Sequence, residues 1–283
     1  MDWGMKNRLS RIINVKTGKA LMLAVDHGYF LGPTSGLDVP ETTIRPLLPF
    51  TDSLMLTRGV LRNCVSSETS VPIVLRVSGG NSILDEDLSN EDITVSIKDA
   101  IKLNVTAMAL SIDVGSEHQH KTLVNLAKLV DIGEEYGIPV LAVTAVGKDM
   151  ARDERYLSLS CRIAAELGAH MVKTYYCENF SQLVRKCPIP VVIAGGKKIE
   201  ELEALKLTSH AIADGALGVD MGRNIFQAEA PVAMIQAVRA IVHEGYSVKK
   251  AYTFYNDLKK KSASKSQPIK IVSPDEALDD RKH

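Results

Sequence analysis

The 283-residue sequence predicts a (β/α)₈ barrel, because short apolar runs and helix-like segments alternate along almost all of it. Most of these runs are continuously apolar, which is typical of strands covered on both faces, as in parallel sheets. Gly137, Gly168 and Gly215 follow helix-like segments at positions where C-cap glycines belong. Eight strand–helix units within about 250 residues match the size of such a barrel. A doubly wound sheet stays open, since periodicity cannot show whether a sheet closes.

Eight short apolar runs are the expected strands. In chain order they are Ala20–Asp26, Ser53–Thr57, Ile73–Val77, Ala107–Asp113, Val140–Thr144, His170–Tyr175, Val191–Ala194 and Gly218–Met221. The expected helices between and after them are Asn90–Leu103, His118–Tyr136, Leu157–Leu167, Ile199–Ala213 and Pro231–His243. Ser89-Asn90-Glu91 and Ser158 carry side chains that cap helix N-termini, so they are the expected starts of two helices.

Residues 1–258 are expected to form a single catalytic domain, since no linker-like segment interrupts the alternation. A chain of this length with 45% hydrophobic residues can bury a large core. Residues 259–283 differ in composition, because the stretch Lys259–Pro268 is polar and low in complexity. They predict a flexible or peripheral C-terminal extension rather than a second domain.

Charge and cysteine usage exclude several classes of protein. The 34 basic and 34 acidic side chains balance, which argues against general binding of nucleic acid or anionic membranes. No apolar run approaches the ~20 residues that span a bilayer, and Met1–Lys6 lacks the apolar segment of a signal peptide. The cysteines form no CxxC pair, so a reducing cytoplasm is the expected setting.

Lys173 is the most informative residue, because it lies within the expected strand His170–Tyr175. A buried ammonium without a partner tends to lose its proton. A neutral lysine amine is a nucleophile that attacks carbonyl groups to form a Schiff base. A lysine at a strand end can also reach water or pair with a carboxylate, and that interpretation stays open for the residue taken alone.

Polar residues gather at the carboxyl ends of the expected strands, where barrels place their active sites. Side chains alternate along a strand, so Lys173 and Tyr175 share one face. The same parity points Asp26 and Asp220 into the barrel. Asp26 and Lys173 then make an acid/base and nucleophile pair. A salt bridge or a cap for the first loop is the alternative role for Asp26.

Two glycine-rich strand ends predict a phosphate site. Gly195 and Gly196 end the seventh expected strand, and Gly222 and Arg223 end the eighth. Late strands of barrels commonly bind phosphate through backbone N–H groups, which glycine lets the anion approach closely. The arginine can add a bidentate contact. Tight turns are the alternative use of these glycines.

Other reactive side chains give weaker signals. Glu117, His118 and His120 suggest metal, but the histidines are two residues apart and would diverge on a helix. We therefore expect a solvated helix start and no metal. Cys177 lies near Lys173, but no adjacent histidine marks it as an activated nucleophile, so a small buried cysteine is expected.

The strand-end motifs together resemble the class I, Schiff-base-forming aldolase family of the DeoC/FbaB type, which includes archaeal-type fructose-bisphosphate aldolases and aminodideoxyheptulosonate synthase. They are most similar to the thiolase branch of that family, which acts in autoinducer-2 catabolism. The resemblance runs from about Asp2 to about Tyr255. The motifs that carry it are LAVDHGYF, VLRVSGGNS, AVTAVGKDM, RIAAELGAHMVKTYY, VVIAGGKK and GVDMGRNIFQ.

This resemblance implies a role for each matching residue. Lys173 forms the Schiff base, and the strand-one aspartate of the family maps onto Asp26. For the chemistry itself, we expect Asp26 to handle protons, with His27 or Tyr175 as helpers. The phosphate contacts map onto Gly195, Gly196, Gly222 and Arg223. One departure stands out, because the family's aldolases carry a Tyr-Pro-Arg-Gly type motif where this chain has Thr144-Ala145-Val146-Gly147. The missing tyrosine favours the thiolase branch over ordinary aldol cleavage.

The resemblance also implies substrates and partners. They are a small phosphorylated ketone and coenzyme A as co-substrate, with no permanently bound cofactor. A large homo-oligomer, such as a decamer, is expected, with Asp2–Ile13 as a candidate interface arm. Lys148, Lys197 and Lys198 either meet the coenzyme A phosphates or are simply solvated. A class I aldolase or transaldolase-like enzyme acting on a sugar phosphate stays an alternative, as does a sugar-phosphate sensor without catalysis.

Overall fold

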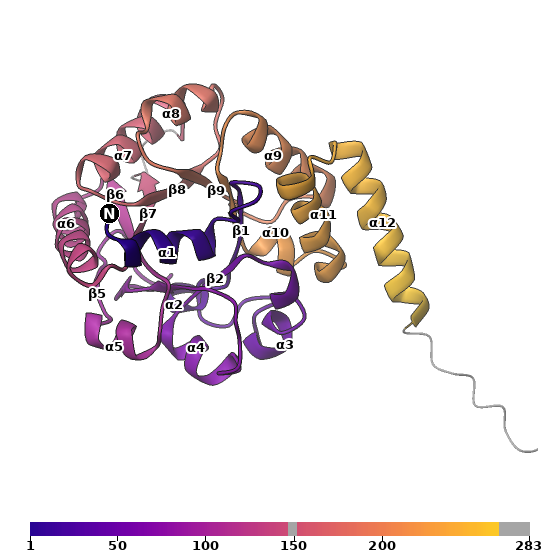
Figure 1. Cartoon of the computed structure of the whole chain (residues 1–283), viewed down its shortest axis with the longest axis horizontal. Coiled ribbons are helices and arrows are strands. Elements are labelled where there is room, and N and C mark those ends of the chain that lie inside the picture. The colour runs from indigo at the N-terminus through magenta and orange to yellow at the C-terminus, as the bar shows by residue number, and fades with distance from the viewer. Residues whose placement is uncertain (147–151, 266–283) are drawn as a thin grey trace, which may run out of the picture.

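The computed structural model describes residues 1–146 and 152–265, and eight of its strands close into a parallel barrel (Figure 1). Each strand pairs with the next barrel strand along the chain, and β10 returns to β1 with Ala20 opposite Gly218. This closure confirms the barrel and rules out the doubly wound sheet. The barrel strands are β1 (Ala20–Ala24), β2 (Ser53–Leu56), β3 (Ile73–Arg76), β6 (Ala107–Val114), β7 (Val140–Val146), β8 (Met171–Tyr175), β9 (Val191–Ala194) and β10 (Gly218–Met221).

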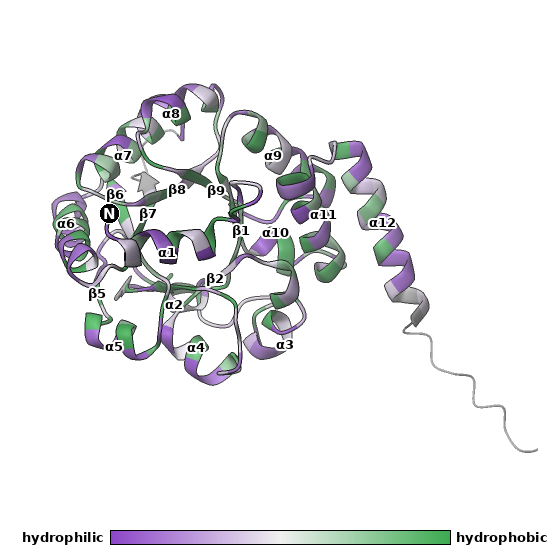
Figure 2. Ribbon diagram, viewed as in Figure 1, coloured by the Kyte–Doolittle hydropathy of each residue, from purple (hydrophilic) through white to green (hydrophobic). Residues whose placement is uncertain are grey.

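Helices surround the barrel on its outer side (Figure 1). They bury apolar side chains against the strands, and Figure 2 shows apolar residues along the strands and mixed polarity along the helices. The described helices are α1 (Trp3–Ile12), α2 (Gly28–Leu31), α3 (Pro40–Ile44), α4 (Arg58–Cys64), α5 (Ile97–Lys102), α6 (Gln119–Tyr136), α7 (Glu154–Glu166), α8 (Phe180–Lys186), α9 (Glu201–Ala213), α10 (Arg223–Phe226), α11 (Pro231–Glu244) and α12 (Val248–Lys265), with a short 3₁₀ turn at Leu48–Phe50.

Helix α1 lies across the barrel in Figure 1 and contributes to its interior. Asp2 caps the helix by accepting a hydrogen bond from the backbone N–H of Met5 at 2.6 Å. Ile12 is fully buried in the apolar cluster inside the barrel, which also contains Met22 and Met55. The segment expected as an interface arm therefore packs on its own chain, although Trp3 remains 79% exposed.

The expected helix Asn90–Leu103 was wrong at its start. The helix there is α5, which begins at Ile97 with Ser96 as its N-cap. Before it, β4 (Ser78–Gly79) and β5 (Asp92–Ile93) pair as an antiparallel hairpin. Glu91 is not a capping residue, because its side chain is buried beneath this hairpin region among polar groups. Tertiary contacts have overridden the local helical pattern.

Helix α7 also begins earlier than expected, at Glu154, with Asp153 as its N-cap in place of Ser158. The boundary predicted after Leu258 lies inside α12, which continues to Lys265. The division into a domain and a tail stays a prediction, since 266–283 lie outside the described residues. In the described part of the chain, no helix combines the length and apolarity needed to cross a membrane.

Ile12→Ala is expected to destabilise the protein by about 2–4 kcal/mol, because it leaves a cavity in a close-packed apolar interior. Urea denaturation followed by circular dichroism measures this loss. Ile101→Ala on α5, where the side chain is 44% exposed, is the matched control and is expected to cost well under half as much. Equal losses for both variants would contradict the role given to α1.

Candidate active site

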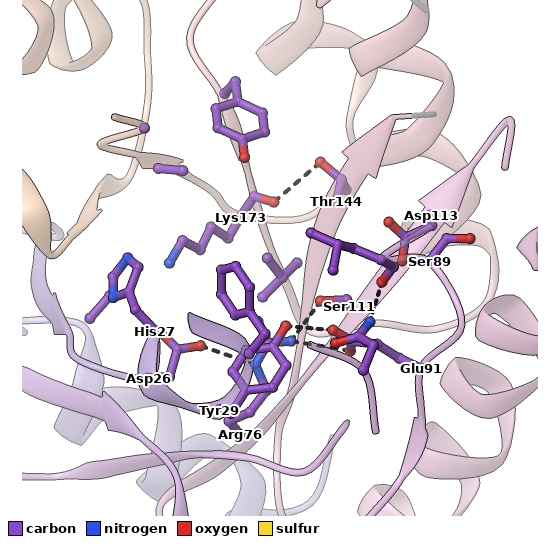
Figure 3. A pocket seen from close by; sticks show the side chains of 18 of the residues that line it. Asp26, His27, Tyr29, Arg76, Ser89, Glu91, Ser111, Asp113, Thr144 and Lys173 are labelled. Carbon is purple, nitrogen blue, oxygen red and sulfur yellow. Dashed lines mark hydrogen bonds and ion pairs between the residues drawn. The ribbon is translucent and has the colours of Figure 1, made fainter. Parts of the chain in front are cut away.

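A cavity of about 630 Å³ opens at the carboxyl end of the barrel (Figure 3). Side chains from the ends of most barrel strands line it, together with the segment before β5. The lining residues used below are Asp26, His27, Tyr29, Arg76, Ser89, Glu91, Ser111, Asp113, Arg152, Lys173, Tyr175, Gly195, Gly196, Lys197, Asp220, Gly222 and Arg223. All eight residues predicted as site residues from the sequence are therefore brought to one cavity.

Lys173 lies deep in this cavity and is only 8% exposed. Its Nζ atom is 2.8 Å from Oδ2 of Asp220, which is buried on β10. The remaining close contact of Nζ is the Sδ atom of Met55, at 3.8 Å. Burial raises the pKa of Asp220, while the charge of Lys173 opposes that rise. A carboxylate with a raised pKa is a suitable acceptor for the proton that a nucleophilic amine must lose.

Arg76 provides the second charged centre and is buried at the end of β3. Its Nε donates to Oδ2 of Asp26 at 3.0 Å, and its Nη1 lies 3.8 Å from Oε2 of Glu91. Burial alone raises the pKa of Asp26, but Arg76, Lys173 and His27 together bring it below the usual value. The salt bridge that was open as an alternative for Asp26 is thus present, and Asp26 still faces the cavity.

A polar network fixes the guanidinium of Arg76 in place. Nη1 donates to Oγ of Ser111 at 2.6 Å, and the guanidinium lies 4.7 Å from the centre of the Tyr29 ring. The hydroxyl of Tyr29 donates to Glu91, and Oγ of Ser78 donates to the same carboxylate at 2.5 Å. Burial is the main cause that raises the pKa of Tyr29. Tyr29 therefore remains a neutral donor, and Glu91 is fully engaged.

His27 follows β1 and stands edge-on to Phe226, with ring centres 5.7 Å apart. Burial is the main cause that lowers the pKa of His27 to about 4. The ring is therefore neutral near pH 7, and one of its nitrogens can accept a proton or a hydrogen bond. Its Nδ1 atom is buried and finds no hydrogen-bond partner among the described residues.

The two glycine loops predicted to bind phosphate lie side by side because Asn224 connects them. Its Nδ2 donates to the backbone oxygen of Gly195 at 2.6 Å, and its Oδ1 accepts from the N–H of Ile199 at 2.9 Å. Gly222 cannot be replaced, since a Cβ there would lie 2.2 Å from the backbone oxygen of Ala24. Nε of Arg223 is buried without a partner among the described residues, so the side chain has donors to offer an anion.

Tyr175 ends β8 at the rim of the cavity, where the guanidinium of Arg152 lies 4.0 Å from its ring centre. Lys197 also lines the rim and is exposed. Lys198 instead pairs with Glu201 at 3.0 Å. Lys148, the third lysine considered for contact with coenzyme A, lies outside the described residues.

The weaker candidates have different outcomes. Cys177 is buried, and burial raises the pKa of its thiol to about 11, as expected for an inert cysteine. Glu117 and His118 approach Asp87, and one ligand atom from each lies within 4.8 Å of the others. His120 is not part of this group. Acidic groups at a surface commonly gather in this way without an ion, so the metal-free expectation stays a prediction.

Sequence reasoning placed none of Arg76, Glu91 and Asp113 among the candidate site residues. Arg76 carried the same signal as Lys173, namely a charge at the end of an apolar run. Glu91 carried no local signal, because its role depends on Arg76 and Tyr29 from distant parts of the chain.

Comparison with known proteins identifies the family. A family model described as DeoC/LacD family aldolase matches residues 20–228. The chain belongs to the DeoC/LacD aldolase family. Among solved structures, an archaeal fructose 1,6-bisphosphate aldolase with its catalytic lysine covalently bound to the carbinolamine intermediate is 26% identical, with a TM-score of 0.76 over 84% of this chain and 99% of that one. The protein is thus a Schiff-base-forming enzyme of the class I aldolase type.

Three curated relatives are more similar in sequence. A 3-hydroxy-5-phosphonooxypentane-2,4-dione thiolase of Photorhabdus laumondii is 56% identical over 90% of this chain and 88% of that protein. The thiolase of the same description from Escherichia coli K12 is 55% identical over the same shares. An uncharacterised aldolase of Pasteurella multocida is 58% identical over 92% of this chain and 89% of its own length.

Arg76→Met is expected to destabilise the protein by about 3 kcal/mol at pH 7, because it leaves Asp26 and Glu91 buried without their cation. The pair stabilises the fold above the unfolded pKa of Asp26, near 3.8, and this contribution is lost as the pH falls below that value. Without Arg76, burial raises the pKa of Asp26, so the variant can relieve its unpaired buried charge by binding a proton as the pH falls toward 4. The loss on substitution should therefore be smaller at pH 4 than at pH 7.

Urea denaturation at both pH values measures this difference. Arg162→Met, which removes an exposed pair with Glu166 on α7, is the control and is expected to cost at most about 1 kcal/mol. A cost for Arg76→Met that does not change with pH would contradict the ion-pair account.

Proposed function

We propose that this enzyme is a thiolase that cleaves phosphorylated 3-hydroxypentane-2,4-dione with coenzyme A, giving acetyl-CoA and dihydroxyacetone phosphate through a Schiff base on Lys173. The observation that carries this proposal is the buried Lys173–Asp220 pair in the same cavity as the glycine loops and Arg223. The thiolases that are 55–56% identical to this chain support the choice of substrates.

The phosphate end of the substrate binds at the glycine loops in this proposal. Backbone N–H groups of Gly196 and Gly222 approach the anion, and Arg223 supplies charge-assisted hydrogen bonds. Gly196 has a φ of 70°, a backbone conformation that favours glycine. Anchoring the phosphate presents the neighbouring C4 carbonyl to Lys173.

Schiff-base formation requires an amine without its extra proton. Asp220 takes a proton from Nζ of Lys173 across their 2.8 Å separation, and the free electron pair attacks C4. Loss of water then gives an iminium. The positive charge of this iminium takes the place of the positive charge of the lysine ammonium in the same pocket. The ionised Asp26, whose charge acts on Lys173, stabilises that iminium.

The bond between C2 and C3 breaks in the next step. The thiolate of coenzyme A attacks the C2 carbonyl, a sulfur–carbon bond forms, and the electrons of the C2–C3 bond move to C3 and on to the iminium nitrogen. Acetyl-CoA departs, and an enamine remains on Lys173. Protonation at C3 and hydrolysis of the imine release dihydroxyacetone phosphate. The thiol proton is the one that C3 gains overall.

His27 and Tyr175 assist in this scheme. Neutral His27, beside Gly222, exchanges protons with the water lost and regained at C4. Tyr175, on the same strand face as Lys173, borders the entrance beneath Arg152. Arg76, held by Asp26 and Ser111, is placed to bind an oxygen of the dione.

A class I aldolase acting on a sugar phosphate is the second candidate, favoured by the similarity to the archaeal aldolase. Aldol cleavage needs a base at the substrate hydroxyl, and this chain has Thr144-Ala145-Val146-Gly147 in place of a tyrosine-containing motif. Thiolysis needs no such deprotonation, because sulfur captures the departing carbonyl carbon. The autoinducer-2 pathway, a cytoplasmic setting and a homo-oligomer remain predictions made from the sequence.

Lys173→Met is expected to abolish borohydride trapping of the dione and to lower turnover by more than about a thousandfold, because the electron sink is lost. Mass spectrometry of the reduced wild-type protein should place the substrate adduct on Lys173. Lys206→Met on α9, where the lysine pairs at the surface with Glu203, is the control and should trap normally. A Lys173→Met enzyme with wild-type turnover would contradict the proposed Schiff-base mechanism.

The same assay with and without coenzyme A separates the two candidate activities. We expect acetyl-CoA and dihydroxyacetone phosphate in equal amounts, and no cleavage when the thiol is omitted. Cleavage of the dione or of fructose 1,6-bisphosphate without coenzyme A would favour the aldolase.

Arg223→Gln is expected to raise the KM for the phosphorylated dione about 10- to 100-fold with little change in kcat, since it removes ground-state binding of the phosphate. Inorganic phosphate should also inhibit the variant less strongly than the wild type. Arg185→Gln, at an exposed position on α8, is the control. An unchanged KM with a lowered kcat would place Arg223 outside the phosphate site.

A further inference from the structure

One carboxylate that lines the cavity has no role in the scheme above. Asp113 lies near the end of β6, and its Oδ2 atom is buried without a hydrogen-bond partner among the described residues. Asp113 as a whole is half-buried, whereas the fully buried acids of the cavity are engaged, Asp26 by Arg76, Asp220 by Lys173, and Glu91 by Tyr29 and Ser78. Buried polar groups are nearly always paired, so an unpaired carboxylate facing a cavity indicates a functional role.

Strand register places Asp113 between Lys173 and the mouth of the cavity. Ser111 is in register with Val143, and Val143 is in register with Lys173. Asp113 is two residues further along β6, which corresponds to about 6–7 Å toward the carboxyl end of the barrel. Figure 3 shows Asp113 beside Ser89 and Glu91, across the cavity from His27. Asp113 therefore lies away from the glycine loops that bind phosphate in the proposed function.

The acyl acceptor must enter from this direction. Coenzyme A carries its thiol at the end of a long arm, and a substrate held by the glycine loops and Lys173 occupies the inner end of the cavity. The attacking sulfur reaches C2 only from the mouth, past the side chains that border it. The sulfur also has to lose its proton, because the thiolate is the nucleophile.

We propose that Asp113 is the general base that takes the proton from the thiol of coenzyme A. This inference rests on the proposed thiolase function. The S–H proton passes to Oδ2 of Asp113 as sulfur bonds to C2, and the C2–C3 electrons move to the enamine. Asp113 then returns that proton to C3, which restores the carboxylate and completes the proton balance.

The electrostatic surroundings of Asp113 suit such a cycle. Burial is the main cause that raises its pKa to about 7, with Glu91 and Asp87 adding to the rise and Arg76 opposing it. A group with a pKa near the working pH serves both as base and as acid. Asp26, whose pKa is lowered, holds a proton poorly, and His27 faces the glycine loops.

The decisive variant is Asp113→Asn, which keeps the shape of the side chain and removes its ionisation. We expect dione trapping on Lys173 to remain normal, and coenzyme A-dependent cleavage to fall about 10²- to 10⁴-fold at pH 7. The wild-type rate should rise with pH through about 7, the pKa of Asp113. The variant's rate should instead rise through about 8.5, where an ordinary thiol ionises without help. An acceptor thiol of lower pKa should restore much of the variant's activity.

Stability measurements test whether the variant is folded and also report on the same carboxylate. The folded pKa of about 7 lies above the unfolded value of 3.8, so the fold loses stability as the pH rises between these two values, and the full penalty of ionising Asp113 is present above about 7. Asp113→Asn removes this penalty, and its melting temperature should exceed that of the wild type at pH 8 by more than at pH 5. Asp131→Asn, at an exposed position on α6, is the matched control and should change neither activity nor melting.

Two results would overturn the inference in distinguishable ways. An Asp113→Asn enzyme that keeps the wild-type rate and pH profile, while the wild type forms acetyl-CoA, would refute the role of Asp113 alone. A wild-type enzyme that traps the dione but forms no acetyl-CoA would overturn the proposed function together with this inference.

Discussion

Opposite charges buried at the carboxyl end of the barrel are the constraint on which the site depends. Lys173 and Arg76 are both less than 9% exposed, and an unpaired cation at that depth would cost several kcal/mol. Asp220 and Asp26 supply the paired anions at 2.8 and 3.0 Å. Each pair joins different strands or the loop after a strand, so the closure of the barrel and the assembly of the site are one structural event.

Pairing divides the cavity into two working regions. Lys173 and Asp220 line the cavity together with the glycine loops, where the proposed function places the electron sink and the phosphate anchor. Arg76 and Glu91 form a rigid polar wall, since both have their partners within the protein. Asp113 borders that wall, and its Oδ2 atom has no hydrogen-bond partner among the described residues, which leaves it available for the proton exchange proposed for it. The arrangement suits a reaction with two substrates that enter one after the other.

The packed interior of the barrel and the contacts between its strand ends hold the reacting side chains in the accurate positions that the proposed chemistry needs. The interior below the site is a cluster of small and flexible apolar residues, closed at the amino end by Ile12 of α1. Asn224 couples the seventh and eighth strand ends through one hydrogen bond in each direction. These contacts hold the two glycine loops and Lys173, to which the proposed function assigns the phosphate and the Schiff base, at strand ends rather than on long loops, so their positions vary little.

The sequence by itself determined the strand pattern, and with it the barrel and the carboxyl-end location of Lys173, Asp26 and the glycine loops. These features depend on local periodicity and on residue types whose burial is costly, so they can be found without a structure. Helix boundaries were less secure, as the misplaced start at Asn90 shows, because local propensity is weak against tertiary contacts. The periodicity of apolar residues predicts a fold but not a family, and the family was identified by similarity to known proteins.

Only the tertiary structure decided which charges meet. Asp220 reaches Lys173 because β9 pairs with both β8 and β10 and sets their relative register. The side chain of Glu91 is buried because it pairs with Arg76 and accepts a hydrogen bond from Tyr29. The Oδ2 atom of Asp113 has no hydrogen-bond partner among the described residues, because the polar groups of the neighbouring wall bond to one another. Such pairing is non-local, since it depends on strand register and barrel closure, and no pattern along the chain contains it.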